Sequence, residues 1–69
     1  MTELEFVDKM KEILDSENIS MDTKLSDIEE WDSLSVVSFL ALAVASSEKT
    51  VSREAVKACT DIKGLYQLL

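Results

Sequence analysis

The chain of 69 residues contains no proline, no histidine, one glycine and one cysteine. The lack of proline and the single glycine leave few obstacles to helix formation. A lone cysteine excludes an internal disulfide, and without histidine it cannot complete a Cys/His metal site. No histidine is present to act as a base beside a nucleophile, and no glycine-rich phosphate loop occurs. The sequence therefore predicts a helical protein that is not itself an enzyme, and a reducing compartment, the cytoplasm.

Long apolar segments and a basic charge are also missing. The longest apolar stretch, 36–45, is interrupted by Ser38 and is far shorter than the roughly 20 residues that span a bilayer. The first residues are acidic, whereas a secretory signal begins with a basic segment. The formal net charge of −7 argues against nucleic acid and suits basic partners. We expect a monomer that binds neither membrane nor nucleic acid.

The spacing of apolar residues predicts where the helices lie. A first helix is expected over residues 3–15, because apolar residues recur there at helical spacing: Leu4, Val7, Met10 and Leu14. Thr2, with Glu5 three residues later, makes a capping-box pattern at its start. Residues 16–32 are rich in turn formers with scattered apolar residues, which is typical of a long loop pinned to the core.

A second helix is predicted to start at Asp32 and Ser33 and to end near residues 46–47. It is apolar nearly all round, so we expect it to be largely buried. Phe39 and Leu42 are either core residues or an exposed strip for a partner, and the pattern does not decide between them. Ser52 and Thr60 are expected to cap a short third helix and a last helix.

The sequence thus predicts one all-α domain over residues 1–69: a four-helix bundle of three main helices and a short third helix, with a long first loop. Within it, Trp31-Asp32-Ser33-Leu34 places a hydroxyl at a helix N-terminus, where unpaired N–H groups and the helix dipole favour a phosphate. The alternative is that Asp32 or Ser33 simply caps the helix.

Asp32-Ser33-Leu34, opening the second helix after a long loop, resembles the attachment motif of acyl and peptidyl carrier proteins. The length, the acidity, the helix order and the tail over 51–62 fit the same family, and Trp31 before the motif is a variant seen in specialised free-standing carriers. The resemblance implies that a phosphopantetheinyl transferase moves 4′-phosphopantetheine from coenzyme A to Ser33, with Asp32 and Leu34 helping it to recognise the site. The thiol of the arm then holds an acyl or aminoacyl group as a thioester.

One departure from that family concerns charge. Fatty-acid carriers usually have acidic residues along the second helix, but residues 35–45 contain none here. The first 32 residues carry eleven acids and three lysines, a net charge of −8, and four of these acids lie just before the second helix: Asp27, Glu29, Glu30 and Asp32. They form either a solvated loop or a relocated docking patch for basic partners.

This departure predicts a specialised pathway rather than bulk fatty-acid synthesis. The expected partners are an acyl- or aminoacyl-activating ligase and an acyltransferase or condensing enzyme. The rival hypothesis is an unmodified helical adaptor that binds a partner through Phe39 and Leu42. Trp31 is expected to pin the loop against the bundle, with contact to the arm as the alternative, and Cys59 to be a small buried apolar residue.

Overall fold

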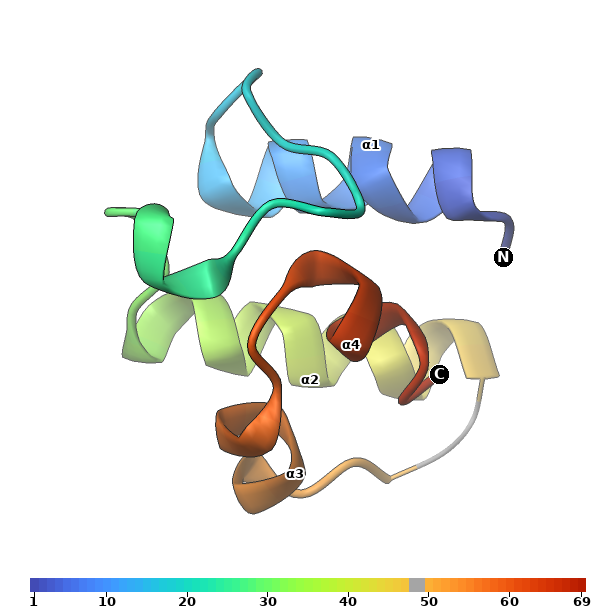
Figure 1. Ribbon diagram of the computed structural model, residues 1–69. Helices are drawn as coiled ribbons and strands as arrows, with labels where there is room; N and C mark the ends of the chain where they lie inside the picture. The colour runs from blue at the N-terminus through green and yellow to red at the C-terminus, as the bar shows by residue number, and fades with distance from the viewer. Residues whose placement is uncertain (48–49) are drawn as a thin grey trace.

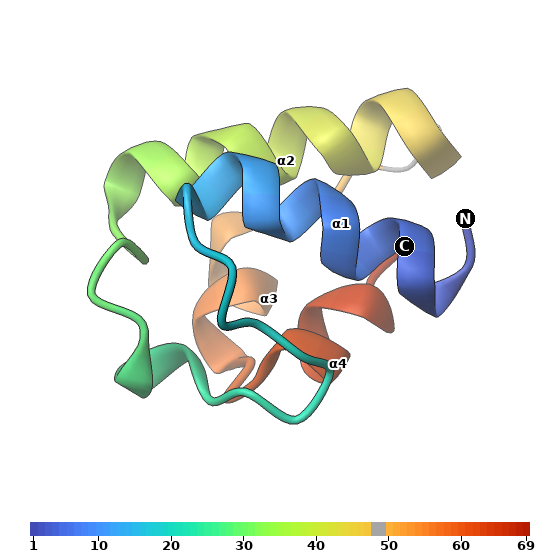
Figure 2. The same ribbon diagram turned by 90° about the horizontal axis from the view of Figure 1, so that it is seen from above.

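The computed structural model describes residues 1–47 and 50–69, and this part of the chain is all-α. Its helices are α1 (Glu3–Leu14), α2 (Ser33–Ser47), α3 (Arg53–Ala58) and α4 (Ile62–Tyr66). A short 3₁₀ helix, η1 (Leu25–Asp27), lies in the long loop between α1 and α2. Figures 1 and 2 show α1 and α2 side by side in opposite directions, with α3 and α4 next to each other on one side of α2. The predicted helix order, the long first loop and the short third helix are confirmed.

Local capping interactions define two of the helix starts as predicted. The Thr2 hydroxyl accepts from the Glu5 N–H at 3.2 Å, and the Glu5 carboxylate accepts from the Thr2 N–H at 3.0 Å. The α1 helix ends at Leu14, one residue earlier than predicted, because Asp15 takes the left-handed conformation with φ of 50°. The Ser52 hydroxyl accepts from the Ala55 N–H at 3.1 Å and caps α3.

The predicted cap of the last helix is wrong by one residue. Asp61, not Thr60, caps α4, and its carboxylate accepts from the Gly64 N–H at 2.8 Å. The Thr60 carbonyl accepts from the Leu25 N–H at 2.9 Å, so Thr60 is held in the extended connection to the long loop. The α4 helix is only five residues long, shorter than expected for a main helix.

The long loop is fastened to the rest of the fold by backbone hydrogen bonds and by buried side chains. Besides the bond to Thr60, the Ile62 N–H donates to the Thr23 carbonyl at 3.0 Å and the Lys63 N–H to the Met21 carbonyl at 3.0 Å. Three loop residues are buried in the core: Ile19, Leu25 and Ile28. The prediction of a loop pinned by apolar residues is therefore confirmed.

The core lies between α1, α2 and the two short helices. Phe6 of α1 and Phe39 of α2 are completely buried and meet edge to face, with ring centroids 6.1 Å apart and an interplanar angle of 84°. The Tyr66 ring lies 5.4 Å from the Phe6 ring on the α4 side. The other helical core side chains come from all four helices: Met10, Leu14, Ala43, Val56, Ile62 and Leu65. Phe39 is thus a core residue, and Leu42 packs partly buried against the core.

The prediction that α2 is largely buried is wrong for one of its faces. Leu34 is 78% exposed, Val37 47% and Val44 52%, and Ala41 is also exposed. These four residues share one side of the helix because they are three or four positions apart. We call them the apolar face of α2. This face stays exposed because so short a chain has too few helices to surround α2. Among the described residues, no helix is long and apolar enough to cross a membrane.

Candidate functional site

The start of α2 brings the predicted site residues together, and Asp32 is the residue that caps it. The Asp32 carboxylate accepts from the Ser35 N–H at 3.0 Å, and the Asp32 carbonyl accepts from the Val36 N–H at 3.0 Å. The Asp32 carboxylate therefore satisfies one of the donors that a helix leaves unpaired in its first turn, and the Asp32 carbonyl accepts the first regular hydrogen bond of the helix. The sequence left open whether Asp32 or Ser33 takes this role, and the geometry assigns it to Asp32.

Ser33 is the first residue of α2 and is exposed. Among the described residues, neither its hydroxyl nor the backbone N–H groups of Ser33 and Leu34 have a hydrogen-bond partner. The hydroxyl is therefore free to be modified, at a helix end where unpaired N–H groups and the helix dipole favour a negative charge.

Ser35 is the site residue that sequence reasoning missed. Its side chain is buried, at 6% exposure, and it is the one polar residue among the buried residues of the described chain. Its hydroxyl donates to the Glu30 carbonyl at 2.6 Å and lies 3.3 Å from the Asp32 carboxylate. The three-residue spacing between Asp32 and Ser35 is typical of a helix cap and could have indicated their contact from the sequence. The hydrogen bond from the Ser35 hydroxyl to the Glu30 carbonyl, five residues back, is visible only in the structure.

Leu34, the third residue of the motif, is the most exposed member of the apolar face of α2. This face begins directly beside Ser33 in the chain and continues along the helix through Val37, Ala41 and Val44. An exposed apolar surface of this kind marks a site of contact with another molecule more often than an isolated exposed side chain does.

The acids before α2 are all exposed: Asp27 at the end of η1, then Glu29, Glu30 and Asp32. Within the described part of the chain, the one salt bridge joins Lys9 to Glu12 at 3.9 Å, so no basic side chain neutralises these four. Their negative charge therefore faces solvent next to Ser33. Both a solvated loop and a docking patch for basic partners agree with this arrangement.

No protein-family model, curated protein or solved structure matches this chain. The functional argument consequently depends on the sequence motif and on the geometry of α2 around and beyond Ser33.

Two further residues singled out in the sequence are only partly buried. Trp31 packs against the core but keeps part of its side chain exposed, so it pins the loop without being enclosed. Cys59 is half-buried, and its thiol lies 3.4 Å from the Ala55 carbonyl as a weak donor. Burial and, to a smaller extent, the nearby Asp61 carboxylate raise the pKa of the Cys59 thiol, so it stays protonated and poorly nucleophilic near neutral pH.

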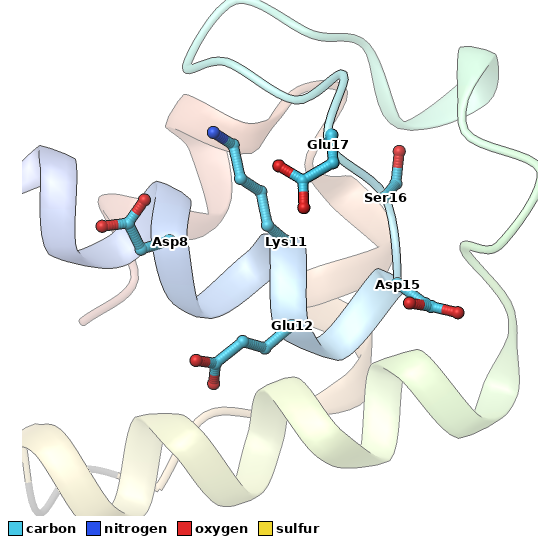
Figure 3. A pocket seen from close by; sticks show the side chains of 6 residues that line it. All are labelled: Asp8, Lys11, Glu12, Asp15, Ser16 and Glu17. Atoms are coloured by element: carbon cyan, nitrogen blue, oxygen red, sulfur yellow. The ribbon is translucent and has the colours of Figure 1, made fainter.

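A polar depression at the C-terminal end of α1 offers no second site. It is lined by charged and polar side chains: Asp8, Lys11, Glu12, Asp15, Ser16 and Glu17. Figure 3 shows that the carboxylates of Asp8, Glu12 and Asp15 point in different directions. Nowhere in the described ranges do three or more potential metal ligands gather. We interpret the depression as solvated surface.

Proposed function

We propose that this protein is an acyl carrier protein whose Ser33 holds a 4′-phosphopantetheine arm. The observation that carries the proposal is the division of roles at the start of α2. Asp32 caps the helix, and the exposed Ser33 hydroxyl has no hydrogen-bond partner among residues 1–47 and 50–69. A serine that only capped the helix would have its hydroxyl engaged by the first-turn N–H groups.

The attachment is a phosphoryl transfer catalysed by a partner transferase. The Ser33 Oγ attacks the pantetheine-bearing phosphorus of coenzyme A. A new P–O bond forms, the bond to adenosine 3′,5′-bisphosphate breaks, and the hydroxyl proton passes to a base of the transferase. Asp32 keeps the helix end formed, and unpaired N–H groups at a helix N-terminus favour the negative charge that the new phosphodiester would carry.

The arm supplies a thiol that carries an acyl or aminoacyl group as a thioester. The role of this chain is then to present the loaded arm to an activating ligase and to an acyltransferase or condensing enzyme. The outward face of α2 is apolar, and the acids lie in the loop before it. This arrangement supports a specialised pathway, because enzymes that dock on an acidic second helix find no carboxylate there.

Intact-mass spectrometry tests the proposal. The protein is incubated with coenzyme A and a broad-specificity phosphopantetheinyl transferase, and we expect the mass of exactly one arm to be added. The Ser33→Ala variant should stay unmodified. Ser38→Ala is the matched control, since Ser38 is an exposed serine on the same helix, and it should be modified like the wild type. An unmodified wild type, or a modified Ser33→Ala variant, would exclude the carrier function.

The second candidate function is an unmodified adaptor, and the exposed apolar face of α2 favours it. The surface first predicted for an adaptor does not exist, because Phe39 is completely buried. Leu34, Val37, Ala41 and Val44 take its place. The mass of the protein isolated from its native cell separates the two functions. An added arm supports the carrier, whereas a fully unmodified population supports the adaptor.

A further inference from the structure

We propose that Ser35 is a positioning residue that ties the end of the long loop to the first turn of α2 and so keeps the Ser33 hydroxyl presented to the transferase. This inference rests on the proposed carrier function and adds a residue to the site that the motif itself does not contain. It follows from the buried position of Ser35 and from its two partners upstream.

The hydrogen bonds of Ser35 close a short loop around Ser33. The Ser35 hydroxyl donates to the Glu30 carbonyl at 2.6 Å, and the Ser35 N–H donates to the Asp32 carboxylate at 3.0 Å. Upstream, the Trp31 N–H donates to the Ile28 carbonyl at 3.2 Å. The backbone on both sides of Ser33 is therefore anchored, although the Ser33 hydroxyl itself makes no hydrogen bond to any of the residues that the structure describes.

The helix geometry links an inward Ser35 to an outward Ser33. Successive residues are rotated by about 100° around a helix axis, so residues two apart point about 200° apart, on nearly opposite sides. Ser35 is buried at 6% exposure, whereas Ser33 is exposed. The hydrogen bond from the Ser35 hydroxyl to the Glu30 carbonyl therefore fixes how the first turn of α2 is rotated about the helix axis. In that rotation the Ser33 hydroxyl points to solvent.

The other hydrogen-bonded serines of α2 show that this role is specific. The Ser46 hydroxyl donates to the Leu42 carbonyl at 2.7 Å, and the Ser47 hydroxyl to the Ala43 carbonyl at 2.8 Å. Both partners lie four residues back in the same helix, so these bonds fasten α2 only to itself. Ser35 alone among these three reaches a carbonyl outside the helix, in the loop that leads to the motif.

Steady-state kinetics of arm transfer, with this protein as the substrate of a broad-specificity transferase, test the inference. We expect Ser35→Ala to lower kcat by roughly tenfold or more, because a misplaced nucleophile spends less time in a reactive geometry. The KM for the carrier should change little, since the surface that the transferase binds is retained. Ser35→Thr keeps the hydroxyl and should restore kcat. Ser46→Ala, which also loses one serine-to-carbonyl bond of α2, should behave like the wild type.

Amide hydrogen exchange on the unmodified protein gives an independent measurement. In Ser35→Ala the amides of Trp31 and Val36, whose hydrogen bonds anchor the backbone on either side of Ser33, should exchange faster than in the wild type, while those at the Ser46 end stay unchanged. If Ser35→Ala does not fold, Ser35→Cys decides, because it keeps the shape of the side chain with a much weaker donor. We expect it to lower kcat as well.

The outcomes separate this inference from the function on which it rests. If the wild type is loaded and Ser35→Ala or Ser35→Cys is loaded with the same kcat, the positioning role is overturned and the carrier function stands. The positioning role is also overturned if Ser46→Ala lowers kcat as much as Ser35→Ala does, or if Ser35→Thr does not restore kcat. The loss of rate would then come from general destabilisation of the protein. A wild type that is not loaded at all overturns both proposals.

Discussion

Replacing Phe39 with leucine tests which face of α2 belongs to the core. Phe39 is 0% exposed and packs edge to face on Phe6, with ring centroids 6.1 Å apart. The substitution removes this aromatic pair, worth about 0.5–1.5 kcal/mol, and leaves a gap where the ring ended. Complete removal of a buried ring to alanine costs about 3–5 kcal/mol, and leucine refills part of that space. We therefore expect Phe39→Leu to lower the free energy of unfolding by about 2 kcal/mol.

The size of the domain makes this loss measurable. A stability of about 0.05–0.15 kcal/mol per residue gives the chain roughly 3–10 kcal/mol in total, so the variant should remain folded. Urea denaturation followed by circular dichroism should show a lower midpoint with an unchanged slope. In a thermal scan, Tm should fall by about 8–16 °C, since 1 kcal/mol corresponds to roughly 4–8 °C in a domain of this size.

Leu34→Ala is the matched control on the same helix. Leu34 is 78% exposed, so its truncation should change the free energy of unfolding by less than about 0.5 kcal/mol. The reasoning is refuted if Leu34→Ala destabilises the protein by more than Phe39→Leu does. The face assigned to solvent would then be the buried one, and the surface available to partners would lie around Phe39.

Three further predictions concern the loop and the first helix. Trp31→Ala should destabilise the protein by about 2 kcal/mol in urea denaturation, less than for an enclosed aromatic, because the ring is only partly buried; a change below about 0.5 kcal/mol would show that it does not pin the loop. Changing Asp27, Glu29 and Glu30 to amides should slow association with the transferase and flatten its salt dependence in stopped-flow measurements, with dissociation little changed; unchanged kinetics at low salt would leave these acids as a solvated loop. Hydrogen bonds from the backbone and side chain of Thr2 lower the pKa of Glu5. The ionised Glu5 carboxylate therefore stabilises α1 at pH values above the ordinary glutamate pKa, and this stabilisation is lost as the pH falls through the lowered pKa. NMR titration should find the Glu5 midpoint below the ordinary range, and a midpoint at or above it would contradict the capping geometry.

Much of the fold was predictable because the deciding interactions are local. The capping box of Thr2 and Glu5 and the cap of Ser52 each join residues three apart in the chain. Such contacts form wherever a helix starts, whatever packs against it. The placement of Asp32-Ser33-Leu34 at a helix start was predictable for the same reason. The cap of α4 was missed because Thr60 is occupied by a backbone bond to Leu25, thirty-five residues earlier in the sequence.

The sequence by itself therefore determined the helix order, the long loop and the place of Ser33 at the start of α2. Only the tertiary structure decided which side of α2 faces solvent. A helix that is apolar nearly all round carries no pattern to distinguish its faces, and the choice depends on where α1, α3 and α4 find room to pack. That choice buried Phe39, left Leu34 and Val44 exposed, and turned Ser35 inward onto the Glu30 carbonyl.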